Sequence, residues 1–284
     1  MNALISTALS GVLLMFVGLF VRNKQHIKYF AIAAVLVAFV ANLAEAATLQ
    51  GGSRALYGMI EVSRFSILFN AVALGATLLY FLLSGSEFEK VGKHVADYFA
   101  LVFFILSGIM LASSFSNLLM LFLAIEIISI PQYILAGSDK KNLKSNEAAL
   151  KYFLMGSFST GILLMGIALI YGAAGTFNIR ELALGSGTLH PLVISGIMLL
   201  IFALSFKVSA VPFHFWTPDV YQGAPMPIVA LFSTGPKMAG MIVIMRFVAA
   251  FADPTIAGAF ADVQLFLGIA ALATLAVGDR KSVV

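Results

Sequence analysis

Apolar runs of about 20 residues recur along this chain and alternate with short polar segments that carry most of its charges. A run of that length crosses the hydrocarbon core of a bilayer as an α-helix. The pattern therefore predicts an all-α, polytopic transmembrane bundle of about nine helices within one domain, residues 1–278. A further short helix, residues 178–184, is predicted to lie on the membrane surface. Seven of the membrane helices are expected over residues 3–21, 29–49, 65–84, 95–113, 117–137, 227–251 and 255–278, and two more begin near residues 145 and 190.

The composition agrees with a membrane protein and excludes several classes of function. Hydrophobic residues make up 61% of the chain and charged residues 11%, which no ordinary soluble domain shows. The chain contains no cysteine, so disulfides, thiolate-bound iron–sulfur clusters and cysteine nucleophiles are excluded, and its 4 scattered histidines leave little scope for haem or metal. The net charge of +4 comes from lysines in short loops, which indicates membrane topology and no nucleic acid.

The loops differ in their content of Lys and Arg. The loops at residues 22–28, 87–94 and 138–144 are rich in lysine and arginine, whereas the earlier intervening loop holds only Arg54 and Arg64. The positive-inside rule places the basic loops in the cytoplasm and the N-terminus outside. No basic residue precedes the first apolar run, and that run is longer than the core of a signal peptide, so it is predicted to be an uncleaved helix.

Glu126 and Lys207 are charged residues inside apolar runs, and each precedes a proline by five positions. Pro131 removes the amide donor that the carbonyl of Ile127 would use, and Pro212 does the same further along. A charged residue beside an unpaired carbonyl is typical of a hydrated site inside a membrane.

Lys237 follows the sequence STGP in the middle of the predicted helix at residues 227–251. A lysine at the centre of a membrane helix costs about 2.5–3.5 kcal/mol, so it needs a partner or a water-filled cavity. Glycine and proline directly before Lys237 predict a helix that is broken at mid-membrane. The two membrane surfaces are too distant for its side chain to reach.

Three other polar residues each allow two interpretations. Lys151 forms a helical i, i+4 pair with Glu147, or it contributes to the intramembrane site through an additional acid. His214 belongs to an aromatic belt with Trp216, or it passes protons, since its unperturbed pKa lies near 6.5. Asp219 either caps a helix or pairs with a cation.

Several of these residues stand in stretches that resemble one family closely. The stretches are residues 206–209 (FKVS), 211–225 (VPFHFWTPDVYQGAP) and 236–237 (PK), and Glu126 and Lys151 fall where the same family has an acid and a lysine. Together they resemble the subunit N family of bacterial NADH-quinone oxidoreductase, respiratory complex I. The resemblance covers essentially residues 1–278, and the wording WTPDVYQGAP separates it from the sibling subunits L and M and from cation/proton antiporters.

The resemblance implies a fold and a function. The fold has two inverted helix repeats, of which only the first, with discontinuous seventh and eighth helices, is complete here. The chain would translocate protons through Glu126, Lys151, Lys207 and Lys237, coupled to electron transfer from NADH to quinone. Pairing with Glu126 would keep Lys207 charged, and separation would send its proton toward Lys237.

The same resemblance implies that this chain holds no cofactor, because other subunits bind NADH, FMN, the iron–sulfur clusters and quinone. The implied partners are the antiporter-like subunit M, the small subunits K and J and the lipid of a bacterial inner membrane. Three alternatives stay open from the residues themselves: a subunit of a cation/proton antiporter, a purely structural membrane subunit, and a plastid or cyanobacterial relative that uses ferredoxin.

The last six residues, 279–284, follow the ninth predicted helix abruptly. They can be encoded by a sequence that resembles a common sequencing adapter. We therefore expect a non-native tail on a fragment of a longer gene product.

Overall fold

The computed structural model describes residues 1–21, 24–49, 52–84, 94–183, 190–250, 265 and 267–276. Within these ranges, eight helical stretches are long and apolar enough to cross a membrane, which confirms the predicted all-α polytopic bundle. The described part of the predicted ninth helix is helical over Leu267–Ala276. Its expected beginning and the tail at residues 279–284 lie outside the described residues.

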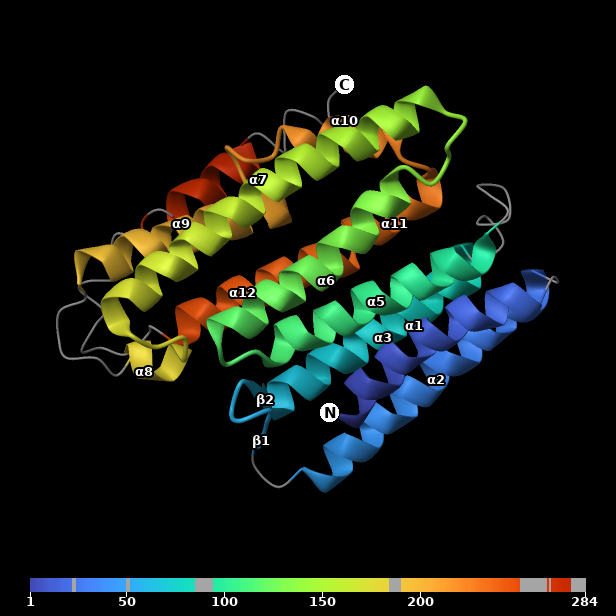
Figure 1. Cartoon of the computed structure of the whole chain (residues 1–284), viewed down its shortest axis with the longest axis horizontal. Helices are drawn as coiled ribbons and strands as arrows, with labels where there is room; N and C mark the ends of the chain where they lie inside the picture. The colour runs from blue at the N-terminus through green and yellow to red at the C-terminus, as the bar shows by residue number, and fades with distance from the viewer. Residues whose placement is uncertain are drawn as a thin grey trace.

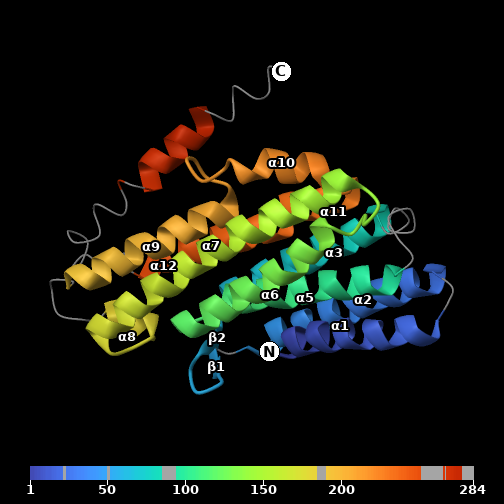
Figure 2. The same ribbon diagram turned by 45° about the horizontal axis from the view of Figure 1, so that its top comes forward.

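The helices of the N-terminal half form one side of the bundle (Figures 1 and 2). They are α1 (Asn2–Phe20), α2 (Lys24–Thr48), α3 (Arg64–Ser84) and α5 (Val95–Ser114). The central member is α5, which contacts α1, α3 and α6 and buries residues on all its faces. Its apolar sequence has no polar stripe, as expected for a helix that is surrounded by other helices.

The helices on the other side of α5 carry the charged residues that the sequence singled out. They are α6 (Leu118–Ala136), α7 (Leu143–Ala174), α9 (Pro191–Val208) and α12 (Gly235–Ala250). Helices α7 and α9 lie close together, and a Cβ added to Gly166 would lie 2.8 Å from the carbonyl oxygen of Gly196. Small residues at such crossings let the backbones of membrane helices meet.

The two predicted helix breaks are present. Helix α9 ends at Val208, Ser209 takes a positive φ of 61°, and α10 (Trp216–Gly223) follows as a separate short helix. The predicted helix at residues 227–251 is divided at Thr234 into α11 (Met226–Ser233) and α12. Lys237 therefore lies in the first turn of α12, directly after the break.

A short helix and a hairpin lie at one end of the bundle (Figure 1). The helix is α8 (Ile179–Ala183), which confirms the short helix expected there. The hairpin consists of β1 (Ser53–Ala55) and β2 (Ile60–Val62), which pair antiparallel. The sequence pattern did not predict this hairpin, because strands of three residues are too short to show an alternation of apolar and polar positions.

The cap of α7 differs from its expected position. Helix α7 begins at Leu143, and its N-cap is Asn142, whose side chain accepts a hydrogen bond of 3.0 Å from the amide of Lys144. Ser145, where the helix was expected to begin, is buried inside α7 and donates to the carbonyl of Ala136. Asparagine and serine are about equally favoured as N-cap residues, so either residue could have capped the start of α7.

Candidate functional site

Lys207 lies in the last turn of α9, and its side chain reaches α6. Its Nζ donates hydrogen bonds to Ser129 Oγ at 2.8 Å and to Tyr133 Oη at 3.4 Å. The same Nζ lies 5.8 Å from the centre of the Tyr133 ring, within the range of a cation–π contact. The ammonium group is thus held by neutral oxygen atoms and an aromatic ring.

Glu126 lies on the same face of α6 as Ser129 and Tyr133, because residues three and seven positions apart align along a helix. Its Oε1 accepts a hydrogen bond of 2.8 Å from the Thr160 hydroxyl of α7. Among the described residues, no ion pair within 4.0 Å joins Glu126 to Lys207. Lys207 therefore binds Ser129, one helical turn from Glu126 on the same face of α6, without an ion pair to Glu126 itself.

Lys237 reaches the same region from α12. Its Nζ lies 5.0 Å from the centre of the Tyr221 ring of α10. The structure shows no hydrogen-bond acceptor or carboxylate bound to this ammonium group within the part of the chain that it describes. A cationic group whose visible partner is an aromatic face is weakly held and can change its contacts easily.

Lys207 and Lys237 line one narrow cavity, to which α6, α7, α9, α10, α11 and α12 all contribute residues. The cavity has room for about one ordered water molecule. Polar groups from several of these helices line it, so such a water would find hydrogen-bond partners. The polar and aromatic residues that line it besides the two lysines are Ser129, Gln132, Tyr152, Trp216 and Phe232.

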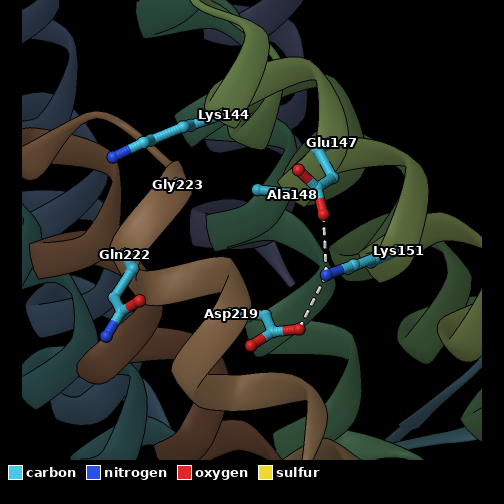
Figure 3. A pocket seen from close by; sticks show the side chains of 7 residues that line it. All are labelled: Lys144, Glu147, Ala148, Lys151, Asp219, Gln222 and Gly223. Carbon is cyan, nitrogen blue, oxygen red and sulfur yellow. Dashed lines mark hydrogen bonds and ion pairs between the residues drawn. The ribbon is translucent and has the colours of Figure 1, made fainter.

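Lys151 is placed away from this cavity, in a second hollow of about 220 Å³ that opens to the surface (Figure 3). Its Nζ lies 2.8 Å from Glu147 Oε1 and 2.9 Å from Asp219 Oδ2. The helical pair with Glu147 is confirmed, and Asp219 is the additional acid. The structure does not bring Lys151 into contact with Glu126.

His214 lies in the turn between α9 and α10 and does not line the cavity of the two lysines. Its Nδ1 is buried, and no partner for that atom is present among the described residues. The neighbouring Trp216 is buried and donates from Nε1 to the carbonyl of Phe206 at 3.1 Å. Trp216 therefore packs inside the protein and does not form the outer aromatic belt that was one of the two interpretations.

Four residues of the site were not found from the sequence. Ser129 and Tyr133 could have been found, because they follow Glu126 by one and two helical turns on the same face. Thr160 and Tyr221 approach from other helices, and no spacing along the chain indicates such contacts.

At the opposite end of the bundle, arginines hold a third group of residues together. Arg246 of α12 donates to the carbonyl oxygens of Ser113 at 2.6 Å and Phe115 at 2.8 Å. These carbonyls belong to the end of α5, where a cation is favoured by the helix dipole. Arg180 of α8 binds Glu61 of the hairpin through Nη2 and Oε1 at 2.5 Å. Within the described ranges, no three His, Asp or Glu residues are grouped so that they could hold a metal ion.

Half-buried lysines beside broken helices are typical of polytopic membrane proteins that transport ions. The family model described as NADH:quinone oxidoreductase/Mrp antiporter, TM, matches residues 114–282, and the chain belongs to this family. The matched region contains all the charged residues of the candidate site.

Individual relatives of the chain belong to the same family. The chain is 42% identical to NADH-quinone oxidoreductase subunit N of Cytophaga hutchinsonii over 84% of its own length and 51% of that protein. It is 39% identical to the protein of the same name in Flavobacterium johnsoniae, over 78% of its own length and 50% of that protein. The resemblance to subunit N is thus confirmed, and the chain spans about half the length of the curated relatives it matches.

Solved structures share the fold. A chain of respiratory complex I from Thermus thermophilus superposes with a TM-score of 0.73 at 31% identity, covering 86% of this chain and 52% of that one. A chain of the Mrp complex from Dietzia sp. superposes with a TM-score of 0.76 at 22% identity over 89% of this chain and 49% of that one, which shows a common fold alone.

Proposed function

We propose that this chain forms part of a proton-translocating membrane subunit of an NADH-quinone oxidoreductase. The observation that carries the proposal is the cavity shared by Lys207 and Lys237. Two lysines on one small, mostly apolar cavity repel each other when both are charged, so the site favours one proton between them. The names of the relatives support the coupling to electron transfer, since they are subunits of an NADH-quinone oxidoreductase.

The proposed transfer starts from the hydrogen bonds of Lys207 and ends on Lys237, which lines the same cavity. Lys207 carries the proton while it is bound to Ser129 and Tyr133. These two residues follow Glu126 on α6 by one and two helical turns. When Lys207 turns toward the cavity, an N–H bond of its ammonium group breaks and one forms on neutral Lys237, directly or through one water. Movement of Lys207 toward Glu126 holds the proton back, because a carboxylate stabilises an ammonium group better than a hydroxyl does.

The same proposal includes the cofactors, the partner subunits and the membrane of the whole enzyme. NADH, FMN, the iron–sulfur clusters and quinone would be bound by other subunits, and the subunits called M, K and J would be the membrane partners. The bilayer would be the bacterial inner membrane, with the basic loop between α6 and α7 in the cytoplasm and the N-terminus outside.

A test of the relay compares Lys237→Ala and Lys237→Arg in the full-length subunit, in membranes that contain the assembled enzyme. Arginine keeps the positive charge but does not release its proton, so a relay loses proton pumping in both variants. A purely structural charge would be preserved by arginine, and pumping would then survive in Lys237→Arg. Pumping in that variant at the wild-type rate and equal assembly would refute the relay.

The cation/proton antiporter is the second candidate, because the Mrp complex shares this fold. The subunit N relatives at 34–42% identity favour the oxidoreductase. Sodium-dependent transport that persists without electron transfer would favour the antiporter instead.

A further inference from the structure

Helix α10 contributes residues both to the cavity of Lys207 and Lys237 and to the surface hollow that Lys151 lines. Its Trp216 lines the cavity of Lys207 and Lys237, and its Tyr221 lies under the ammonium group of Lys237. Its Asp219 and Gly223 line the other hollow, which opens to the surface beside α7. The position of α10 therefore decides how close its aromatic rings lie to the two lysines.

One face of α10 fastens it to α7 at three points. Trp216 stacks on Tyr152 with ring centres 4.7 Å apart. Asp219, one turn further, binds Lys151 at 2.9 Å (Figure 3). At the third point, a Cβ added to Gly223 would lie 2.5 Å from the carbonyl oxygen of Lys144, so only glycine lets the end of α10 approach α7 this closely.

The three contacts differ in how easily they open. The stacked rings are buried, and the glycine contact is a backbone contact. The ion pair is about half-exposed on both sides, and water in the open hollow reaches it. A half-exposed pair contributes little to stability, so its removal is compatible with a folded protein.

We propose that Asp219 is a positioning residue of the proton path. Its ion pair with Lys151 sets the distance of α10 from α7 and so holds Trp216 and Tyr221 against the cavity of the two lysines. Lys151 thus acts on the lysine site through α10, and Glu147 is its second acid, contributed by α7 itself. This inference rests on the proposed function, since it assigns a role in the same path.

The chain offers a direct measurement of the position of α10. It contains no cysteine, so Val220→Cys introduces a single thiol into this chain at a site with 0% exposure on α10. The full-length subunit carrying this change, with any cysteine outside residues 1–284 replaced by serine, is labelled with a maleimide in the assembled enzyme, and the labelled subunit is quantified over time. Asp219→Asn is expected to raise the labelling rate about two- to fivefold, the range that loss of a half-exposed pair allows.

The matched control is Glu147→Gln, which removes the other carboxylate of Lys151 and leaves the contact with α10 intact. Its labelling rate is expected to stay at that of the Val220→Cys parent. Asp219→Lys should raise the rate further by placing two cations together, and the exchange Lys151→Asp with Asp219→Lys should restore it. If Asp219→Asn does not assemble, Asp219→Glu and the exchange variant test the same pair with both charges present.

Proton pumping is measured on the same preparations. The proposal requires that pumping falls in the variants with faster labelling and recovers in the exchange variant. Unchanged labelling in Asp219→Asn, an equal effect of Glu147→Gln, or full pumping despite faster labelling would each overturn it. The relay itself is judged separately by Lys237→Arg, so the positioning role can fail while the relay stands.

Discussion

Gly156 of α7 faces the Tyr133 hydroxyl that contacts Lys207, and it leaves no room for a side chain. A Cβ at position 156 would lie 2.0 Å from Tyr133 Oη and 2.6 Å from its Cζ, whereas real Cβ atoms essentially never approach within 3.0 Å. The Tyr133 side chain would have to retreat by about 1 Å. The rings of Tyr152 and Phe153 pack edge-on against the Tyr133 ring, with ring centres 4.9 and 5.7 Å from its centre. These two rings obstruct the movement of Tyr133.

The expected cost of Gly156→Ala follows from two opposing effects. Overpacking a filled site costs about 1–3 kcal/mol. Replacing glycine by alanine within a helix recovers about 0.5–1 kcal/mol. The matched control is Gly161→Ala on the same helix, where an added Cβ would meet nothing within 4 Å. Because both variants share the helix effect, Gly156→Ala should be less stable than Gly161→Ala by the overpacking cost, about 1–3 kcal/mol.

The assay is reversible unfolding of the full-length subunit in mixed micelles, followed by helix content. Adding Tyr133→Phe to Gly156→Ala should recover part of the loss, because the phenyl ring lacks the oxygen at 2.0 Å but keeps the carbon at 2.6 Å. Equal stability of Gly156→Ala and Gly161→Ala would refute the packing of Tyr133 between Gly156 and Lys207.

Three further predictions concern the contacts around the site. Thr160→Val removes the hydroxyl bound to Glu126 and should lower stability by about 1.5–3 kcal/mol, as for a hydrogen bond to a charged group, while Thr160→Ser should keep most of it in the same unfolding assay. Tyr221→Leu should reduce pumping more than Tyr221→Phe, since phenylalanine keeps the ring under Lys237 and a cation–π contact contributes about 0.5–2 kcal/mol; equal rates in the two variants would contradict it. Arg246→Ala leaves two carbonyls at the end of α5 without their donor and should cost about 1–3 kcal/mol for each, whereas an unchanged melting temperature would contradict the cap.

The membrane helices and their breaks could be predicted because each depends on a local feature of the sequence. Apolar length sets the spans, and the pair Gly235 and Pro236 weakens the helix just before Lys237. The buried lysines could be found for the same reason, since a charge inside an apolar run is visible without knowing what surrounds it. What the sequence could not supply was the set of residues that contact Lys207 and Lys237.

The two charge-and-proline patterns show how local reasoning reaches its limit. Both predict a disturbed helix, yet α6 continues as one helix through Pro131, whereas α9 ends at Val208. The difference lies in Ser209, which takes the left-handed conformation while the amide of Ala210 bonds to the carbonyl of Ser205 at 2.9 Å. That cap lies three residues before Pro212 and ends α9 at Val208. Left-handed caps are usually formed by glycine or asparagine, so the serine at this position did not predict the end of the helix.

The contacts of Lys207 also bear on how a proton could move. A lysine bound to a carboxylate keeps its proton firmly, because a nearby opposite charge stabilises the ammonium form. In the described part of the chain, Lys207 is bound to the Ser129 and Tyr133 hydroxyls, and Glu126 is bound to Thr160. Each member of the expected ion pair therefore has a separate hydroxyl partner, so pair separation leaves neither charge without a hydrogen bond. The cost of separating them is reduced by these hydroxyls, and a pair that separates at low cost is what a switchable proton carrier requires.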